Sequence, residues 1–203
     1  MAKGPSASEK RLGDLGTDEV PALGFIELSS ISRGLFLTDA VLKKALVKII
    51  ASHPISSGKH VLLFMGDVAS VEESQKEALA LADGTVVKQI IIPNIHAGLV
   101  LFLDSLWQSG FSKPALQSVG IVESTTLAAA VLAADRALKS ADVSLCRFRL
   151  GQGIGGKAYF VLTGKQEDVE ASLEAAKACL QSLESFNRVD IIPRPQNEAL
   201  AYF

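Results

Sequence analysis

The chain has 203 residues, of which 48% are apolar and 21% are charged, and its formal net charge is -2. This length allows one large domain or two small ones with buried cores, and the composition is that of a globular protein, not a disordered one. The near-neutral charge gives no dominant basic face, which argues against a protein built to bind nucleic acid.

The first residues, 1–19, are polar and lack the apolar core of a signal peptide, so we expect a flexible N-terminal arm. The apolar stretch 99–107, "LVLFLDSLW", is too short to span a membrane and contains Asp104. Cys146 and Cys179 lie far apart in the sequence and are expected to be reduced thiols of a cytosolic protein.

The next elements are predicted in chain order from their hydrophobic spacing. Residues 23–28 are predicted to form a strand, and a helix follows with apolar positions at Leu35, Val41, Leu42 and Ala45. Further strands are expected at 47–52 and 59–66, a helix at 68–82 and a fourth strand ending in Ile-Ile-Pro. The segment 98–107 is expected to form a terminal helix that covers its domain.

The second half of the chain repeats the first. Residues 22–47 align with 118–143 without a gap, and after an insertion of two residues 58–74 aligns with 156–172. The identical pairs include Asp39 with Asp135 and Lys43 with Lys139. The repeat predicts two domains, at 20–112 and 113–203, joined near 109–117 where Gly110 and Pro114 indicate a linker. Each has the order β-α-β-β-α-β, so we expect an α+β protein with two tandem ferredoxin-like domains and mainly antiparallel strand pairing.

The stretch 150–160, "LGQGIGGKAYF", contains the pattern G-x-G-x-x-G. A dinucleotide-binding loop needs these glycines between a strand and a helix, whereas a strand is predicted to follow here. We therefore expect a turn between two strands that uses glycine for positive φ angles and close backbone approach. The loop "HPISSGK" occupies the same place in the first copy.

These residues resemble a known family. D-x-x-L-K-x-A in both copies, Gly-Lys after each loop, G-x-x-x-x-V-E-x-S and I-I-P-R-P resemble the domain of bacterial microcompartment shell proteins. The two copies resemble the tandem-domain class (BMC-T) in its non-permuted, PduT-like form, over about residues 20–203. The resemblance implies a homotrimer of BMC domains that imitates a hexamer and joins other shell proteins in a cytoplasmic bacterial microcompartment.

The resemblance also implies roles for individual residues. The loops before Gly-Lys would line a central pore for small polar metabolites. The pore-lining residues would be Ser56, Ser57 and Gly58 in the first copy, and Ile154, Gly155 and Gly156 in the second. Lys43, Lys139 and Arg194 would lie at the tile edge, where Asn94 replaces the arginine in the first copy.

Some PduT-like relatives hold an iron-sulfur cluster through a cysteine in the first loop. Ser56 occupies that position here, and a serine hydroxyl is a poor ligand for a cluster that requires thiolates. We therefore expect no iron-sulfur cluster and no other cofactor.

Other polar residues are given structural interpretations. His53 and His60 could bind a metal around an axis, but neither recurs in the second copy, so they are expected at a loop or strand end, and no metal site is predicted. His96 is expected to cap or follow a helix start. Glu27 and Glu123 recur without a nucleophile, which favours hydrogen bonding over acid-base catalysis.

The sequence favours a structural shell protein with no catalytic residues. The alternative is a small-molecule-binding regulatory module, because pairs of ferredoxin-like domains also bind ligands at their interfaces. An enzyme is disfavoured, because no nucleophile and base converge in the repeat.

Overall fold

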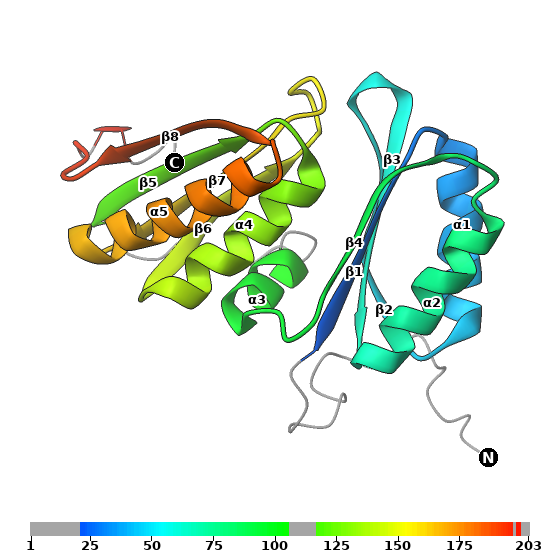
Figure 1. Cartoon of the computed structure of the whole chain (residues 1–203). Coiled ribbons are helices and arrows are strands. Elements are labelled where there is room, and N and C mark those ends of the chain that lie inside the picture. The colour runs from blue at the N-terminus through cyan, green and yellow to red at the C-terminus, as the bar shows by residue number, and fades with distance from the viewer. Residues whose placement is uncertain (1–20, 106–116, 197, 200–203) are drawn as a thin grey trace, which may run out of the picture.

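The computed structural model describes residues 21–105, 117–196 and 198–199, which form two domains of the same topology (Figure 1). The predicted arm at 1–19, Trp107, the predicted domain boundary at 112/113 and nearly all of the linker lie outside the described residues.

Both domains have the predicted element order. The first contains β1 (Ala22–Leu28), α1 (Ile31–Lys44), β2 (Lys48–Ile55), β3 (Lys59–Gly66), α2 (Val68–Leu81) and β4 (Val86–Ile92). The second contains β5 (Ser118–Ser124), α4 (Leu127–Ser140), β6 (Val143–Leu150), β7 (Ala158–Gly164), α5 (Gln166–Ser182) and β8 (Phe186–Ile192). The sheet orders β2-β3-β1-β4 and β6-β7-β5-β8, with antiparallel neighbours throughout, confirm the ferredoxin-like prediction.

Side-chain caps fix where the helices of the first domain begin. The Ser30 hydroxyl accepts a hydrogen bond from the main-chain N–H of Arg33 at the start of α1 (3.3 Å). At the start of α2, the Asp67 carboxylate accepts the N–H of Ser70 at 2.8 Å and its hydroxyl at 2.6 Å. The hydroxyl of Ser70, followed by its N–H, lowers the pKa of Asp67, because both bonds favour the charged carboxylate.

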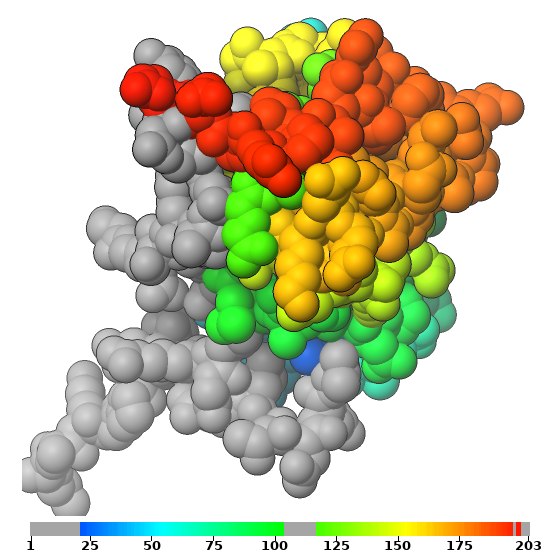
Figure 2. Space-filling view, turned by 90° about the vertical axis from the view of Figure 1, so that its left-hand side faces the viewer, coloured from blue at the N-terminus to red at the C-terminus, as the bar shows by residue number. Residues whose placement is uncertain are grey.

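The two faces of the first sheet are covered by different parts of the chain. Helices α1 and α2 pack on one face, around a cluster that includes Ile26, Leu62 and Phe64. The other face, with Phe25 and Leu63, shares one continuous core with α4 of the second domain, which lies between the two sheets (Figure 1). The domains are therefore joined through an apolar interface. On the side away from the first domain, α5 and β8 lie at the surface (Figure 2).

The predicted helix at 98–107 forms as α3 (Ala97–Ser105), but its neighbours differ from those expected. It packs mainly against α4 and β6 of the second domain, with Leu99 and Leu103 buried in the shared core. Sequence periodicity shows that a helix has an apolar face but not which domain covers that face. None of the helices in the described residues is both long and apolar enough to cross a membrane.

The core of the first domain contains a buried polar chain that the second domain lacks. The His60 ring is fully buried, with Nε2 2.9 Å from the Ser52 hydroxyl, which lies 2.7 Å from the Thr38 hydroxyl. A Cβ at Gly34 would lie 2.2 Å from His60 Cδ2, so only glycine leaves room for the imidazole. In the repeat alignment, Ala130 and Ala158 replace Gly34 and His60.

Burial lowers the pKa of His60 below its ordinary value of 6.5, with a smaller contribution from nearby His53. The unfolded chain therefore takes up a proton at a higher pH than the folded chain does. The free energy of unfolding should fall as the pH drops below about 6.5 towards the folded-state pKa.

We expect the double variant Gly34→Ala and His60→Ala, which copies the alanine pair of the second domain, to lose part of this pH dependence. Urea denaturation between about pH 7 and pH 5, with parent and variant side by side, measures the difference. The single variant His53→Ala is the control, because it removes a histidine that lies outside the buried chain of His60, Ser52 and Thr38. Equal slopes for the parent and the double variant would contradict the assignment to His60.

Candidate functional site

The loops between β2 and β3 and between β6 and β7 lie side by side at the top of the view in Figure 1, where the two domains meet. Hydrogen bonds join them across the two domains. The Ser56 hydroxyl donates to the Gly151 carbonyl (2.6 Å) and accepts from the N–H of Gly153 (3.1 Å). The main-chain N–H of Ser56 also donates to the Gly151 carbonyl, at 3.2 Å. One serine thus fastens the first loop to the second.

The backbone angles explain why both loops are rich in small residues. Ser57 and Gly58 have φ angles of 68° and 72°, and Gly153, Gly155 and Gly156 have φ angles of 73°, 65° and 79°. Residues other than glycine adopt this left-handed region at a cost in free energy, because their Cβ crowds the backbone. A Cβ at these glycines would meet nothing within 4 Å, so φ, not lack of room, requires glycine here.

The glycine pattern of the second loop is not a nucleotide-binding loop of the dinucleotide type. The loop leads from β6 into β7, a strand, as the sequence predicted. No helix N-terminus follows the glycines to hold a pyrophosphate. The expectation of a glycine-rich turn between two strands is confirmed.

All six predicted pore residues lie on these adjoining loops. Ser57, Gly58 and Gly155 are exposed, whereas Ser56, Ile154 and Gly156 are half-buried. Sequence reasoning missed the bonds that join the loops, which involve Gly151 and Gly153. It also missed that the Gln152 amide lies 3.2 Å from His53 Nδ1. The two-residue insertion in the second loop was the sequence feature that could have indicated these contacts, because added residues extend a loop towards its neighbour.

Replacing Ser56 with alanine should loosen the junction between the loops. The variant removes one donor and one acceptor, so we expect a loss of about 1 kcal/mol of local stability and roughly fivefold faster amide exchange at Gly153. Hydrogen exchange followed by NMR measures this rate. Ser57→Ala is the control, because Ser57 takes no part in these bonds; equal acceleration in both variants would refute the role of Ser56.

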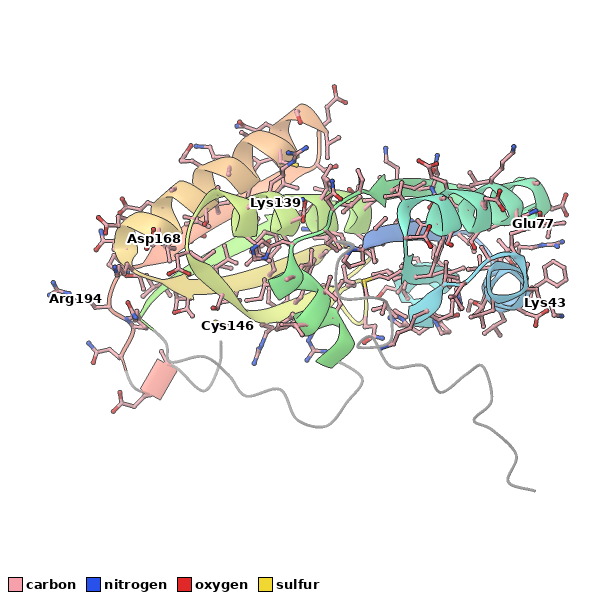
Figure 3. The ribbon with its side chains drawn as sticks, turned by 90° about the horizontal axis from the view of Figure 1, so that it is seen from below. Lys43, Glu77, Lys139, Cys146, Asp168 and Arg194 are labelled. Atoms are coloured by element: carbon pink, nitrogen blue, oxygen red, sulfur yellow. The ribbon has the colours of Figure 1, made fainter. Side chains whose placement is uncertain are left out.

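The four residues predicted to lie at the tile edge occupy separate positions in the structure. Lys43 and Lys139 lie in the last turns of α1 and α4, while Asn94 and Arg194 are exposed just beyond β4 and β8. Figure 3 shows Lys43 and Arg194 at opposite ends of the molecule. Asn94 has a φ of 53°, a left-handed angle that asparagine adopts more readily than most residues.

The repeated Asp-Lys pairs have the same spacing but different surroundings. Lys43 lies 2.5 Å from Asp39, with side chains 74% and 62% exposed. Lys139 lies 2.6 Å from Asp135, whose side chain is only 2% exposed. The Asp135 carboxylate also accepts the main-chain N–H of His96 from the first domain, at 2.8 Å. In the second copy this aspartate is therefore part of the interface between domains.

The recurring glutamates accept hydrogen bonds, as expected. Lys59 Nζ lies 2.8 Å from Glu27 Oε1, and the Asn187 side-chain amide donates to Glu123 at 2.6 Å. His96 precedes α3 and accepts the N–H of Gly98 on Nδ1 at 3.1 Å, which confirms the expected cap. The described residues contain no group of three or more His, Cys, Asp or Glu side chains that could hold a metal ion.

Neither cysteine forms a disulfide within the described residues. Cys146 is buried on β6 and Cys179 is half-buried on α5, so neither lies in a loop. Burial raises the pKa of Cys179. Nearby Arg136 lowers it by a smaller amount and Asp135 raises it slightly, so the protonated thiol is favoured.

Comparison with known proteins decides the family. The model of the BMC domain matches twice, at residues 22–95 and 118–195. The chain belongs to the BMC-domain family of bacterial microcompartment shell proteins. It is 37% identical to the bacterial microcompartment shell protein PduT of Citrobacter freundii, over 86% of this chain and 92% of that protein. It is also 27% identical to the carboxysome assembly protein CcmO of Synechocystis, over 96% of this chain and 68% of that protein.

Two solved microcompartment structures share the fold over most of this chain. The crystal structure of a microcompartment protein from Desulfitobacterium hafniense has a TM-score of 0.84 and 31% identity, covering 90% of this chain and 99% of that one. A fused permuted hexameric shell protein from the RMM microcompartment has a TM-score of 0.58 and 25% identity, covering 82% of this chain and 84% of that one. The tandem BMC fold and the structural shell role expected from the sequence are thus confirmed.

Proposed function

We propose that three copies of this BMC protein close head to tail into a flat, pseudo-hexameric tile with the paired loops at its centre. The proposal is supported by two surfaces that occur once in each domain: the outer face of the first helix and the sheet face opposite the domain's own helices. Where the two domains of one chain meet, the helix face of the second domain and the sheet face of the first domain are buried. The equivalent helix face of the first domain is exposed, and the equivalent sheet face of the second domain is partly exposed. Such a surface pair is heterologous, and heterologous contacts close into rings when the rotation between units permits.

The first of these surfaces is the outer face of the first helix in each domain. Leu35 and Leu42 on α1 are 57% and 51% exposed. The equivalent residues on α4, Val131 and Leu138, are 0% and 4% exposed. Helix α4 is covered by the first domain, so the matching apolar face of α1 is suited to the second domain of another copy.

The second surface is the sheet face opposite the domain's own helices. On the first sheet this face is buried by the second domain, and Phe25 and Val61 have no exposed surface. On the second sheet the equivalent residues Ile121 and Tyr159 remain partly exposed. We expect α1 of the next copy to pack against this sheet face.

A polar contact supports the same arrangement. Within the chain, Asp135 accepts the N–H of His96, which follows β4. Asp39 has no such partner among the described residues, and the residue equivalent to His96 is Gln196, which follows β8. In the ring, we expect Asp39 to accept the N–H of Gln196 from a second copy.

Closure of the ring would bring the paired loops of the three copies around one axis. Exposed Ser57 hydroxyls and loop N–H groups would then border the opening. Groups of this kind replace part of the water shell of a small polar solute, so the opening is suited to small polar metabolites.

The first loop does not fit an iron-sulfur cluster. Its thiolate position holds Ser56, whose hydroxyl is already bonded to Gly151 and Gly153. Clusters of this type require thiolates, so we propose that the trimer carries none. Iron analysis of anaerobically purified protein tests this proposal, and stoichiometric iron with sulfide would contradict it.

Lys43, Lys139, Asn94 and Arg194 are proposed to meet other shell proteins at the tile edge in a cytoplasmic microcompartment, with no catalytic role. Electron microscopy of sheets formed with partner shell proteins tests this arrangement. We expect Arg194→Ala to impair sheets while leaving trimers intact. The control is Arg188→Ala, because Arg188 pairs with Asp190 (2.6 Å) within its own strand. Normal sheets from the Arg194 variant would contradict the edge assignment.

A further inference from the structure

A cavity of about 250 Å³ lies between the two domains, close to the paired loops. Strand β2 of the first domain and strand β6 of the second form two of its walls. Both strands lie at the edge of their sheets, and the space between them is lined by Ile50, Leu63 and Phe148 among other apolar residues. Cavities at domain interfaces that combine apolar walls with a few polar groups are common sites for small ligands.

The polar side chains of this cavity are basic or neutral. Arg149, His53 and Gln152 line it, and none of the described residues that line it is acidic. Arg149 is exposed, and no ion pair of its guanidinium occurs among the described residues. His53 and Arg149 are equivalent positions in the sequence repeat, so the two edge strands direct matched positions to one cavity.

We propose that this cavity binds a small organic acid with a short hydrocarbon chain. The carboxylate would pair with Arg149, since a guanidinium offers two parallel N–H donors to a carboxylate. The hydrocarbon chain would lie among Ile50, Leu63 and Phe148. The volume suits an acid of about four carbons and is below the range of larger ligand pockets.

The site would also be linked to the loops. Gln152 lines the cavity and contacts His53, and the next residue, Gly153, donates to Ser56 of the other loop. A ligand in the cavity therefore borders the residues that hold the loops together. Any effect of the ligand on the pore rests on the proposed function, whereas binding of the ligand does not.

Isothermal titration of the full chain with sodium butyrate tests the proposal. We expect saturable binding of one butyrate per chain, weakened roughly tenfold or more by Arg149→Gln. Ala51→Leu should also weaken binding, because the larger side chain fills the cavity that Ala51 lines. Arg147→Gln is the matched control, since Arg147 lies on the same strand outside the cavity lining, and it should leave the affinity within about twofold.

The proposal would be overturned by the absence of saturable binding, or by equal affinities for the parent and the Arg149 variant. Binding of 1-butanol as tight as that of butyrate would also overturn it, because the carboxylate would then contribute nothing. Circular dichroism shows whether each variant is folded. Native mass spectrometry of the same samples reports the trimer separately, so a failure of ring closure is distinguishable from a failure of the ligand site.

Discussion

Replacing Leu35 with aspartate is expected to break up the proposed trimer and leave a folded monomer. Leu35 is 57% exposed on α1, whereas its equivalent Val131 is fully buried between the domains. Burial of a leucine side chain contributes about 2 kcal/mol, and the ring contains this contact once at each junction between copies. A carboxylate at that place would also lose its water without gaining a partner.

The matched control is Leu46→Asp. Leu46 is 60% exposed near the end of the same helix, but its equivalent in the second domain is already an aspartate, Asp142, which is exposed. The same chemical change should therefore leave the trimer intact. Analytical ultracentrifugation across a range of concentrations measures both variants. If both remain trimeric, or both dissociate alike, α1 does not make the proposed contact.

Replacing Asp135 with alanine is expected to destabilise the chain by about 2 kcal/mol, because the N–H of His96 would lose its acceptor in the interface between domains. The Lys139 side chain, at 35% exposure, can turn to water and adds less to the loss. Urea denaturation compares the free energies of unfolding of the parent and the variant.

Replacing Asp39, the equivalent of Asp135, with alanine provides an internal comparison. In the monomeric Leu35→Asp background, Asp39→Ala should cost less than about 0.5 kcal/mol, since its pair with Lys43 is exposed. In the trimer, where Asp39 would gain the environment of Asp135, the cost should approach that of Asp135→Ala. An equal cost in both backgrounds would show that no neighbouring copy covers Asp39.

The sequence was sufficient to predict the fold because the two copies carry the same pattern twice. Short apolar runs with a glycine predicted β1 and β5, and helical spacing predicted α1 and α4, in agreement with the structure. Glycines in the loop at 151–156 were correctly interpreted as turn residues, since a strand followed them.

The sequence was not sufficient to show how the two copies differ. Asp39 and Asp135 occupy identical D-x-x-L-K motifs, yet one is exposed and the other is buried. That difference arises from the neighbouring domain, which no local pattern describes. For the same reason, the packing of α3 on the second domain and the Ser56 bonds between loops were found only in the structure.

A cryo-electron microscopy structure of the assembled protein would show whether three copies close around the paired loops. We expect a trimer in which α1 of each copy lies on the second sheet of the next, with Ser57 and Gly155 facing a common central opening. A structure with these loops at the outer rim, or with α1 facing solvent in the assembled particle, would contradict it.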